Sequence, residues 1–128
     1  MSATVTASVP SGTPRIDLTV AQGATYVAEF TWLVDGVARS LAECSAVMAF
    51  AQRVGREPVV TVSSKDGEIT LEPDAHIGVI SVRVPAAKTA LLRSKAPYAY
   101  DLIVLRGTEV HRVVEGKVTV RRAVALAG

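Results

Sequence analysis

Short runs in which apolar and polar residues alternate limit the fold of this chain more than any other feature. In TYVAEFTWL, residues 25–33, every second side chain from Tyr26 to Trp32 is apolar or aromatic. A period of two places these side chains on one face of an extended strand, whereas a helix needs a period of about 3.6. The same pattern predicts further strands within 15–20, 59–64, 69–73, 78–84, 98–105 and 110–120.

The segment SLAECSAVMAFAQR is the one place where composition and pattern disagree. Ala, Leu, Glu and Met all favour a helix. Its apolar residues nevertheless alternate, with Ala46, Met48 and Phe50 on one side. Val47 and Ala49, on the other side, are also apolar, as in a strand that is covered on both faces. The alternation therefore predicts a strand here.

Breaks between these strands carry turn residues. The pair Asp35-Gly36 predicts a tight hairpin turn, because glycine supplies the positive φ that such turns require. The helical candidate PAAKTALLRS, residues 85–94, is too short for more than about two turns and is expected to be a connector. Gly116 interrupts the last strand, where we expect a bulge or a bend.

The order of these elements predicts an all-β fold of one domain. Strands recur without βαβ alternation, and the 128 residues are rich in Val and Ala with only 5% aromatics, which is typical of an antiparallel β-sandwich. We expect about eight or nine short strands and one short connector helix. Residues 1–13 are predicted to form a tail that is flexible unless a partner orders it, 14–122 the sandwich, and 123–128 a C-terminal tail.

Two tyrosines narrow the sandwich type. In APYAYDLIVL, Tyr98 and Tyr100 share a face, and Tyr98 follows the expected helical crossover. Immunoglobulin-like sandwiches place a tyrosine corner at such a point, with a hydroxyl bonded to the chain just upstream. This predicts an immunoglobulin-like sandwich. We expect one core between the sheets, with contributions from Tyr26, Phe30, Trp32, Met48, Phe50, Ile69, Leu71, Ile80, Val82, Leu91, Tyr98, Tyr100, Leu102 and Val118.

Charge and cysteine content exclude several classes of protein. A net charge of +2, with cations and anions interspersed, lacks the clustered cations of a nucleic-acid-binding surface. No window approaches the roughly 18 apolar residues of a membrane span, and the first residues do not resemble a signal peptide. The lone Cys44 rules out an internal disulfide. A soluble protein made in a cytoplasm is expected.

Residues that carry chemistry in other proteins are scattered here. His76 and His111 stand in different segments with no second ligand at a matching spacing, so they are expected to be exposed or at the rim of the fold. The sequence contains no nucleophile motif and no glycine-rich phosphate loop. The analysis of residues therefore predicts no catalytic, cofactor-binding or metal-binding residues, and no enzyme activity.

Carboxylates and the single tryptophan also have structural explanations. Asp66, Glu68, Glu72 and Asp74 lie in or next to turns, where turn chemistry and solubility account for them. A platform for a carbohydrate is one role for Trp32, but Trp32 shares a face with Tyr26 and Phe30, which favours a place in the core.

The order and spacing of several stretches resemble a family of small bacteriophage virion domains, similar to the N-terminal domain of baseplate upper proteins of siphophages. The stretches are VAQGATYVAEFTWLVDGVARSL, GEITL, VPAAKTALL and APYAYDLIVLRGTEVHRVVEGKVTV, which together span most of residues 18–120. The resemblance implies a non-enzymatic virion component with an immunoglobulin-like sandwich and no catalytic residues.

This resemblance implies a tail-associated adaptor for a tail, fibre or baseplate, with a capsid decoration or cement protein as the alternative and a carbohydrate-binding module as the third possibility. The expected partners are other virion proteins and copies of the chain itself, without nucleic acid, membrane, small-molecule substrate or cofactor. The expected location is the virion, assembled in the cytoplasm of the bacterial host.

The two ends of the chain are candidates for binding. SATVTASV, before Pro10, and VTVRRAVALAG, near the C-terminus, are rich in β-prone residues and carry few charges. Segments of this kind can add as strands to the edge of a neighbouring sheet. The sequence thus predicts that the termini are weakly ordered in the free protein and that they mediate assembly.

Overall fold

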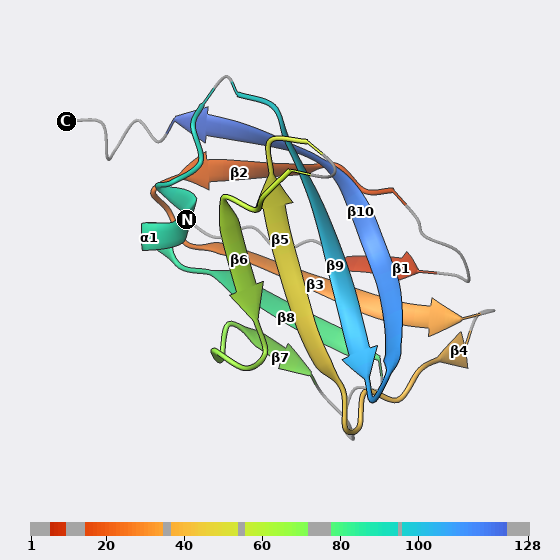
Figure 1. Ribbon diagram of the computed structural model, residues 1–128. Helices are drawn as coiled ribbons and strands as arrows, with labels where there is room; N and C mark the ends of the chain where they lie inside the picture. Colours follow the sequence, from red (N-terminus) through yellow and green to blue (C-terminus); the bar gives the residue numbers. More distant parts are fainter. Residues whose placement is uncertain are drawn as a thin grey trace.

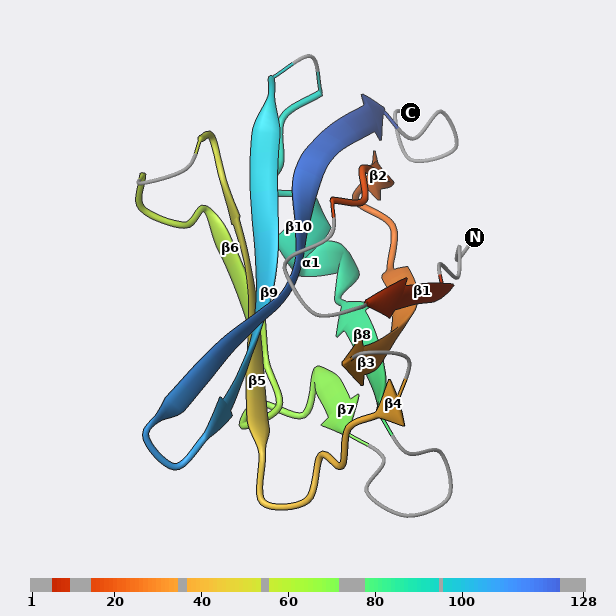
Figure 2. The ribbon, with the colours of Figure 1, turned by 90° about the vertical axis from the view of Figure 1, so that its right-hand side faces the viewer.

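The computed structural model describes residues 6–9, 15–34, 37–53, 56–71, 78–94 and 96–122. These residues form a sandwich of two β-sheets with one short helix at its end (Figure 1, Figure 2). The elements are β1 (Thr6–Val9), β2 (Leu18–Gln22), β3 (Tyr26–Val34), β4 (Val37–Ala38), β5 (Ser45–Ala51), β6 (Val60–Ser63), β7 (Ile69–Leu71), β8 (Val79–Val84), α1 (Ala86–Thr89), β9 (Tyr98–Arg106) and β10 (Glu109–Arg122).

The first sheet, here called the β3 sheet, has the order β1-β3-β8-β7, and β4 also pairs with β3. Val34 stands opposite Val37, as expected for strands that flank a two-residue turn, although Asp35 and Gly36 lie outside the described residues. β1 pairs in parallel with β3, from Thr6 opposite Glu29 onward. The flexible tail expected over residues 1–13 stays a prediction, and of these residues the structure describes 6–9. The β-prone TASV segment occupies an edge of β3 that would otherwise lack a partner.

The second sheet, here called the β9 sheet, has the order β2-β10-β9-β5-β6. β10 is antiparallel to β9 up to Val118 and parallel to β2 from Val118 to Arg122. The predicted sandwich with one short helix is confirmed, and two of its strand pairs are parallel. The described residues form ten strands, one or two more than the expected eight or nine, and the sequence pattern did not indicate β1 and β4. An immunoglobulin-like connectivity stays a prediction.

The core lies between the two sheets and consists of the alternate, inward-facing residues of both. It includes the predicted residues with two exceptions. Leu71 is partly exposed and packs at the border of the core, and Leu91 is 58% exposed while its neighbour Leu92 is fully buried. The prediction for Leu91 was wrong because the helix ends after a single turn, at Thr89. Beyond it the backbone forms a tighter turn, closed by a hydrogen bond from Leu92 N–H to the Thr89 carbonyl, so helical spacing no longer gives the buried position.

The predicted tyrosine corner is confirmed as a hydrogen bond. The Tyr98 hydroxyl accepts a bond of 2.8 Å from the backbone N–H of Arg93, five residues upstream. This bond ties the start of β9 to the segment that follows α1. The ring itself is buried between the sheets, so Tyr98 is a structural residue.

The irregularity expected at Gly116 lies elsewhere. The register between β10 and β9 shifts between Arg112 and Val114, and both Val113 and Val114 are buried there. Gly116 has a different role. A Cβ atom at this position would overlap the backbone carbonyl of Ile16, so glycine lets the segment before β2 lie directly against β10.

The outer edge of β6 is covered by a buried ion pair. Ser63 N–H donates to Glu68 Oε1 at 3.3 Å, and Lys88 Nζ donates to the carbonyl of Thr61 at 2.7 Å. Lys88 and Glu68 also pair with each other at 2.7 Å, with the carboxylate only 12% exposed. Backbone groups at the edge of β6 are thereby satisfied from within the chain, which disfavours pairing with a further strand.

Candidate functional site

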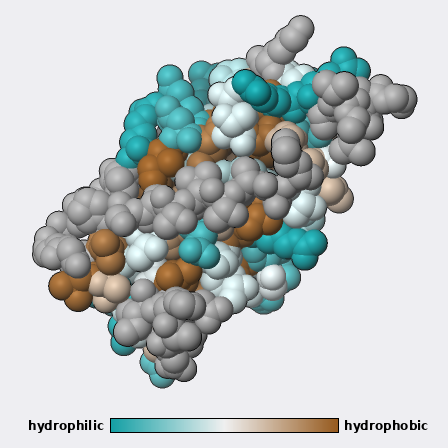
Figure 3. Space-filling view, turned by 180° about the vertical axis from the view of Figure 1, so that it is seen from behind, coloured by the Kyte–Doolittle hydropathy of each residue, from teal (hydrophilic) through white to brown (hydrophobic). Residues whose placement is uncertain are grey.

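The outer face of the β3 sheet mixes polar and apolar residues, with Val27 and Val79 on either side of a polar centre. Across its centre, Glu29 stands opposite Ser81, and Ser81 stands opposite Thr70. Arg83, one row away on β8, is exposed. Figure 3 shows this face, on which hydrophilic and hydrophobic residues lie in separate small areas. Alternation of an apolar inner face and a polar outer face is what an antiparallel sheet with one solvated side requires.

The outer face of the β9 sheet is different. Val47 stands opposite Ile103, and Leu105 stands opposite Val110. The outward residues of β5, together with those of β9 and β10 near them, form what we call the apolar strip: Val47, Ala49, Ala51, Ala99, Ile103, Leu105 and Val110. All are partly or largely exposed, and Val110 is 62% exposed.

No described helix or strand covers the apolar strip. Figure 2 shows the β9 sheet edge-on, with α1 and the β3 sheet on its inner side. The sequence indicated a strand covered on both faces at 45–51, and the structure supplies a cover on one face only. An apolar sheet face of this kind marks an interaction surface. The strip is therefore the candidate functional site.

Two charged residues of β10, Arg112 and Glu115, border the strip, and Asp101 of β9 lies within it between Ala99 and Ile103. Arg112 Nε lies 3.7 Å from Asp101 Oδ2, and Arg112 Nη1 lies 3.5 Å from Glu115 Oε2. The Arg112 side chain is 50% exposed and the two carboxylates 39% and 41%. Ion pairs this exposed contribute little to folding stability. They remain available to a partner, and they place both signs of charge beside apolar surface.

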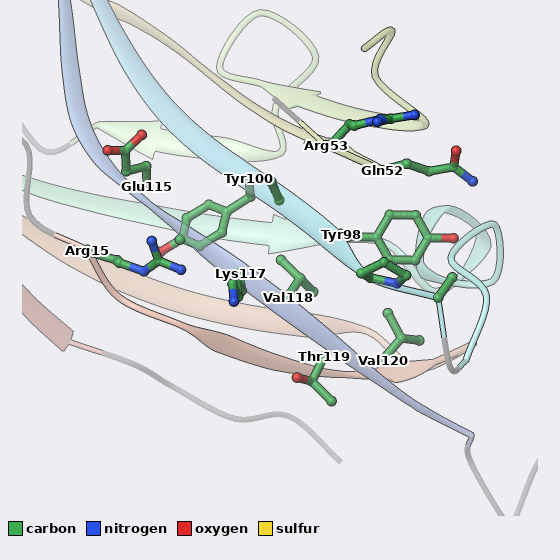
Figure 4. A pocket seen from close by; sticks show the side chains of 14 residues that line it. Arg15, Gln52, Arg53, Tyr98, Tyr100, Glu115, Lys117, Val118, Thr119 and Val120 are labelled. Carbon is green, nitrogen blue, oxygen red and sulfur yellow. The ribbon is translucent and has the colours of Figure 1, made fainter. Parts of the chain in front are cut away.

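A hollow of about 790 Å³ opens at one end of the strip, where β10 leaves β9 and approaches β2. Figure 4 shows Arg15 and Glu115 at one end of it and Gln52 and Arg53 at the other. Among the described residues, no histidine, cysteine or serine lines the hollow.

The buried tyrosines beneath this region are structural. Tyr100 Oη donates a bond of 2.7 Å to the Ile16 carbonyl, and Tyr26 Oη is a buried hydroxyl without a hydrogen-bond partner in the described part of the chain. Burial raises the pKa of Tyr26 to about 12. Burial, and to a smaller extent the charges of Tyr26, Asp17 and Glu115, raises the pKa of Tyr100 further. Both phenols are therefore neutral at physiological pH.

His111 and Trp32 lie together at the boundary of the two sheets. The two ring centroids are 5.2 Å apart. The Arg39 guanidinium also contacts the Trp32 ring, at 5.6 Å from its centroid. Trp32 is 7% exposed, as predicted for a core residue. His111 is partly exposed and within 4.0 Å of Glu109, which fits the predicted position at the rim. His76 lies outside the described residues.

The remaining predicted positions also have structural partners. Asp66 N–H donates to Ser63 Oγ in the turn before β7, and Cys44 is a free thiol whose Sγ lies 3.5 Å from the Ala42 carbonyl. Glu72 and Asp74 lie outside the described residues. Within the described ranges, no three His, Cys, Asp or Glu side chains are grouped closely enough to hold a metal ion.

Within the part of the chain that the structure describes, no helix is long and apolar enough to cross a membrane.

Comparison with known proteins adds a similarity of fold. No family model matches the sequence, and no curated protein matches it. Among solved structures, the N-terminal domain of phage TP901-1 ORF48 is similar, with a TM-score of 0.52 and 12% sequence identity. The match covers 94% of this chain and 99% of that one. At this identity the similarity concerns the fold alone: the chain has the fold of a domain found in a phage protein.

Proposed function

We propose that this chain is a non-enzymatic structural protein of a bacteriophage virion, a tail-associated adaptor that acts by protein-protein assembly through the outer face of the β9 sheet. The observation that carries the proposal is the apolar strip on a sheet face that no described element covers. The similarity of fold to a domain of a phage protein supports the proposal that the particle is a bacteriophage virion.

The contrast between the two sheets supports an assembly role for this face. The central row on the outer side of the β3 sheet is polar, with Glu29, Ser81 and Thr70. On the outer side of the β9 sheet, Ile103 and Val47 share a central row, and Leu105 lies one row away. Folding removes only part of the apolar area of Ile103 and Leu105 from water, and contact with a protein partner removes more of it.

A structural role also agrees with the chemistry of the described residues. Side chains able to act as nucleophile, base or metal ligand are dispersed, and the two perturbed groups, Tyr26 and Tyr100, are shielded core phenols. Function through a binding face needs no reactive group. The residues that carry it are those of the strip and the charges beside it, Asp101, Arg112 and Glu115.

The test is to locate the chain in purified particles of the phage that encodes it. Quantitative mass spectrometry of separated heads and tails should find it in tails, at a low copy number set by tail symmetry. Hundreds of copies in heads would favour a decoration protein instead. Absence from both would overturn a virion role.

Substitution within the strip tests the face itself. Ile103→Lys places a charge at the centre of the strip and should reduce incorporation into particles at least about tenfold. Ser81→Lys, at the centre of the polar outer face of the β3 sheet, is the matched control and should incorporate like the wild type. Equal incorporation of both variants would exclude the strip.

A further inference from the structure

We propose that the partner of the apolar strip is a second copy of this chain, packed face to face about a two-fold axis with Arg112 of each copy against Glu115 of the other. The inference deepens the proposed function, on which it rests for the choice of face. It follows from the order of residues in neighbouring rows of the β9 sheet.

Two adjacent rows cross the centre of this face. In one row, Arg112 stands opposite Ile103, and Ile103 opposite Val47. In the next row, Glu115 stands opposite Asp101, and Asp101 opposite Ala49. On β10, the first row therefore carries a cation, Arg112, and the second an anion, Glu115. On β5, the first row carries the larger Val47 and the second the smaller Ala49.

Consider a two-fold axis that lies in the interface, parallel to the two rows and midway between them. Rotation about this axis places the Arg112 row of one copy against the Glu115 row of the other copy. Arg112 then meets the partner's Glu115, and the symmetry produces this contact twice. Val47 meets Ala49 and, one row farther out, Leu105 meets Ala99, so larger side chains face smaller ones. Asp101 meets Ile103 and keeps its own Arg112 as an ion partner.

This arrangement is self-complementary in charge, which is the requirement for a two-fold contact between identical faces. An axis through the Asp101 row would set Arg112 against the partner's Lys117, because these two residues flank Glu115 on the outward side of β10. An axis between the Glu115 and Lys117 rows would also pair opposite charges, but it would set Ile103 and Val47 against residues beyond the ends of β9 and β5. The axis between the Arg112 and Glu115 rows both pairs opposite charges and keeps Ile103 and Val47 inside the contact.

The face is also large enough for a specific contact. Strands lie about 4.8 Å apart and rise about 3.3 Å per residue. The nine paired residues of β9 and of β10, the seven of β5 and the four of β6 therefore have a flat footprint of roughly 460 Å². Side-chain relief makes the accessible surface larger than the footprint. A standard protein interface buries about 800 Å² on each partner, so a second copy seated on the whole face reaches the range of specific complexes.

Charge reversal separates this contact from a folding effect. Sedimentation equilibrium of the purified chain should show a dimer, and Arg112→Glu or Glu115→Arg alone should weaken dimerisation at least about tenfold, because each creates two repulsive contacts. At a concentration low enough for the wild type to be monomeric, both variants should melt like it, since the groups are half exposed. Ser81→Lys, on the other sheet, should leave the dimer intact.

Mixing the two variants gives the decisive measurement. An Arg112→Glu chain carries two anions and a Glu115→Arg chain two cations at these positions, so an equimolar mixture should recover the dimer as a heterodimer. The double variant, with the two charges exchanged, should dimerise with itself. A wild type that stays monomeric over the accessible concentrations, single variants that dimerise like it, or a mixture that fails to associate would each overturn the proposal.

These measurements need no virion, so their failure can be distinguished from a failure of the proposed function. A dimer that is absent from particles contradicts the virion role and leaves the contact standing. A monomeric chain that is incorporated through the same face contradicts the dimer, and the occupant of the strip is then a different virion protein.

Discussion

The Tyr100 hydroxyl donates a hydrogen bond of 2.7 Å to the backbone carbonyl of Ile16, across 84 residues of sequence. Ile16 N–H in turn donates to the Glu115 carbonyl at 2.8 Å. One residue ahead, the side chain of Asp17 accepts a bond from Lys117 N–H at 2.9 Å. These bonds hold the segment before β2 against β10 and β9, and they close one end of the β9 sheet.

Removal of this hydroxyl should destabilise the fold modestly. Tyr100→Phe leaves the Ile16 carbonyl without its donor in a buried place, which should lower the free energy of unfolding by about 1 to 2 kcal/mol. Tyr26→Phe is the matched control, because Tyr26 Oη has no partner among the described residues and its loss should be neutral or stabilising. Urea denaturation measures both, and equal effects would contradict the assigned bond.

Gly116→Ala should be more damaging. The added methyl group would overlap the Ile16 carbonyl, which is backbone and is held by the bonds described above. Overpacking of this kind costs about 3 kcal/mol. Lys117→Ala, at the exposed next position of β10, should change stability by less than about 0.5 kcal/mol. A Gly116→Ala chain that melts like the Lys117→Ala chain would show that this contact is not tight.

Stability should fall in alkaline solution because of the buried phenols. The pKa of Tyr26 rises from 10.0 to about 12 on folding, so the unfolded chain loses this proton at a lower pH than the folded chain. The stabilisation that results from the neutral form is complete below pH 10 and is lost as the pH rises towards 12. Tyr100 acts in the same direction.

The measurement is the urea midpoint between neutral pH and pH 12, the upper end of the Tyr26 titration. The midpoint should decrease less steeply above pH 10.0 in Tyr26→Phe than in the wild type, since one shifted group has been removed. Loss of the Tyr26 charge also makes the pKa of Tyr100 less raised, which flattens the decrease in the same direction. Identical slopes would show that the Tyr26 hydroxyl is not shielded in the folded state.

Sequence patterns predicted the strands and their inner faces well, because a period of two is a local signal that packing reinforces. The run around Met48 and Phe50 is an example, since alternation correctly outweighed helix propensity. Pairings between distant segments were beyond such signals. The parallel contacts of β1 with β3, and the approach of Ile16 to Gly116, depend on the completed sandwich.

The candidate site was only half visible in the sequence. Apolar residues on both sides of β5 indicated a second covered face, which is the origin of the strip. The neighbours that complete the face, Ile103 and Arg112, follow from the registers of three strands, and a shift of one residue in any of them would change every contact. The bulge between Arg112 and Val114 adds to this, because no sequence signal placed it there.

Helical spacing in the sequence also failed to predict which of Leu91 and Leu92 is buried after α1. The burial of Leu92 in place of Leu91 can be tested. Leu92→Ala removes a fully buried side chain and should cost about 2 to 5 kcal/mol. Leu91→Ala removes one that is 58% exposed and should cost less than about 0.5 kcal/mol. Thermal melts of the two variants decide the matter, and the reverse order would restore the prediction made from helical spacing.

Deletion of the N-terminal segment has a different expected effect on stability if this segment is a strand of the sheet than if it is a loose tail. Because β1 pairs with β3 from Thr6 to Val9, deletion of residues 1–13 removes a strand from the β3 sheet, whereas a loose tail would be lost without cost. Each net backbone hydrogen bond contributes about 1 kcal/mol, offset by the entropy of ordering the segment, so a loss of about 1 to 3 kcal/mol is expected. Hydrogen exchange should show faster exchange at the amides of β3 that face β1.

Truncation after Arg122 is the control, since it leaves every described strand whole. If the shortened and the full chain melted at the same temperature with the same exchange in β3, β1 would not be a stable part of the sheet in solution, and its four residues would again be candidates for pairing with a neighbour.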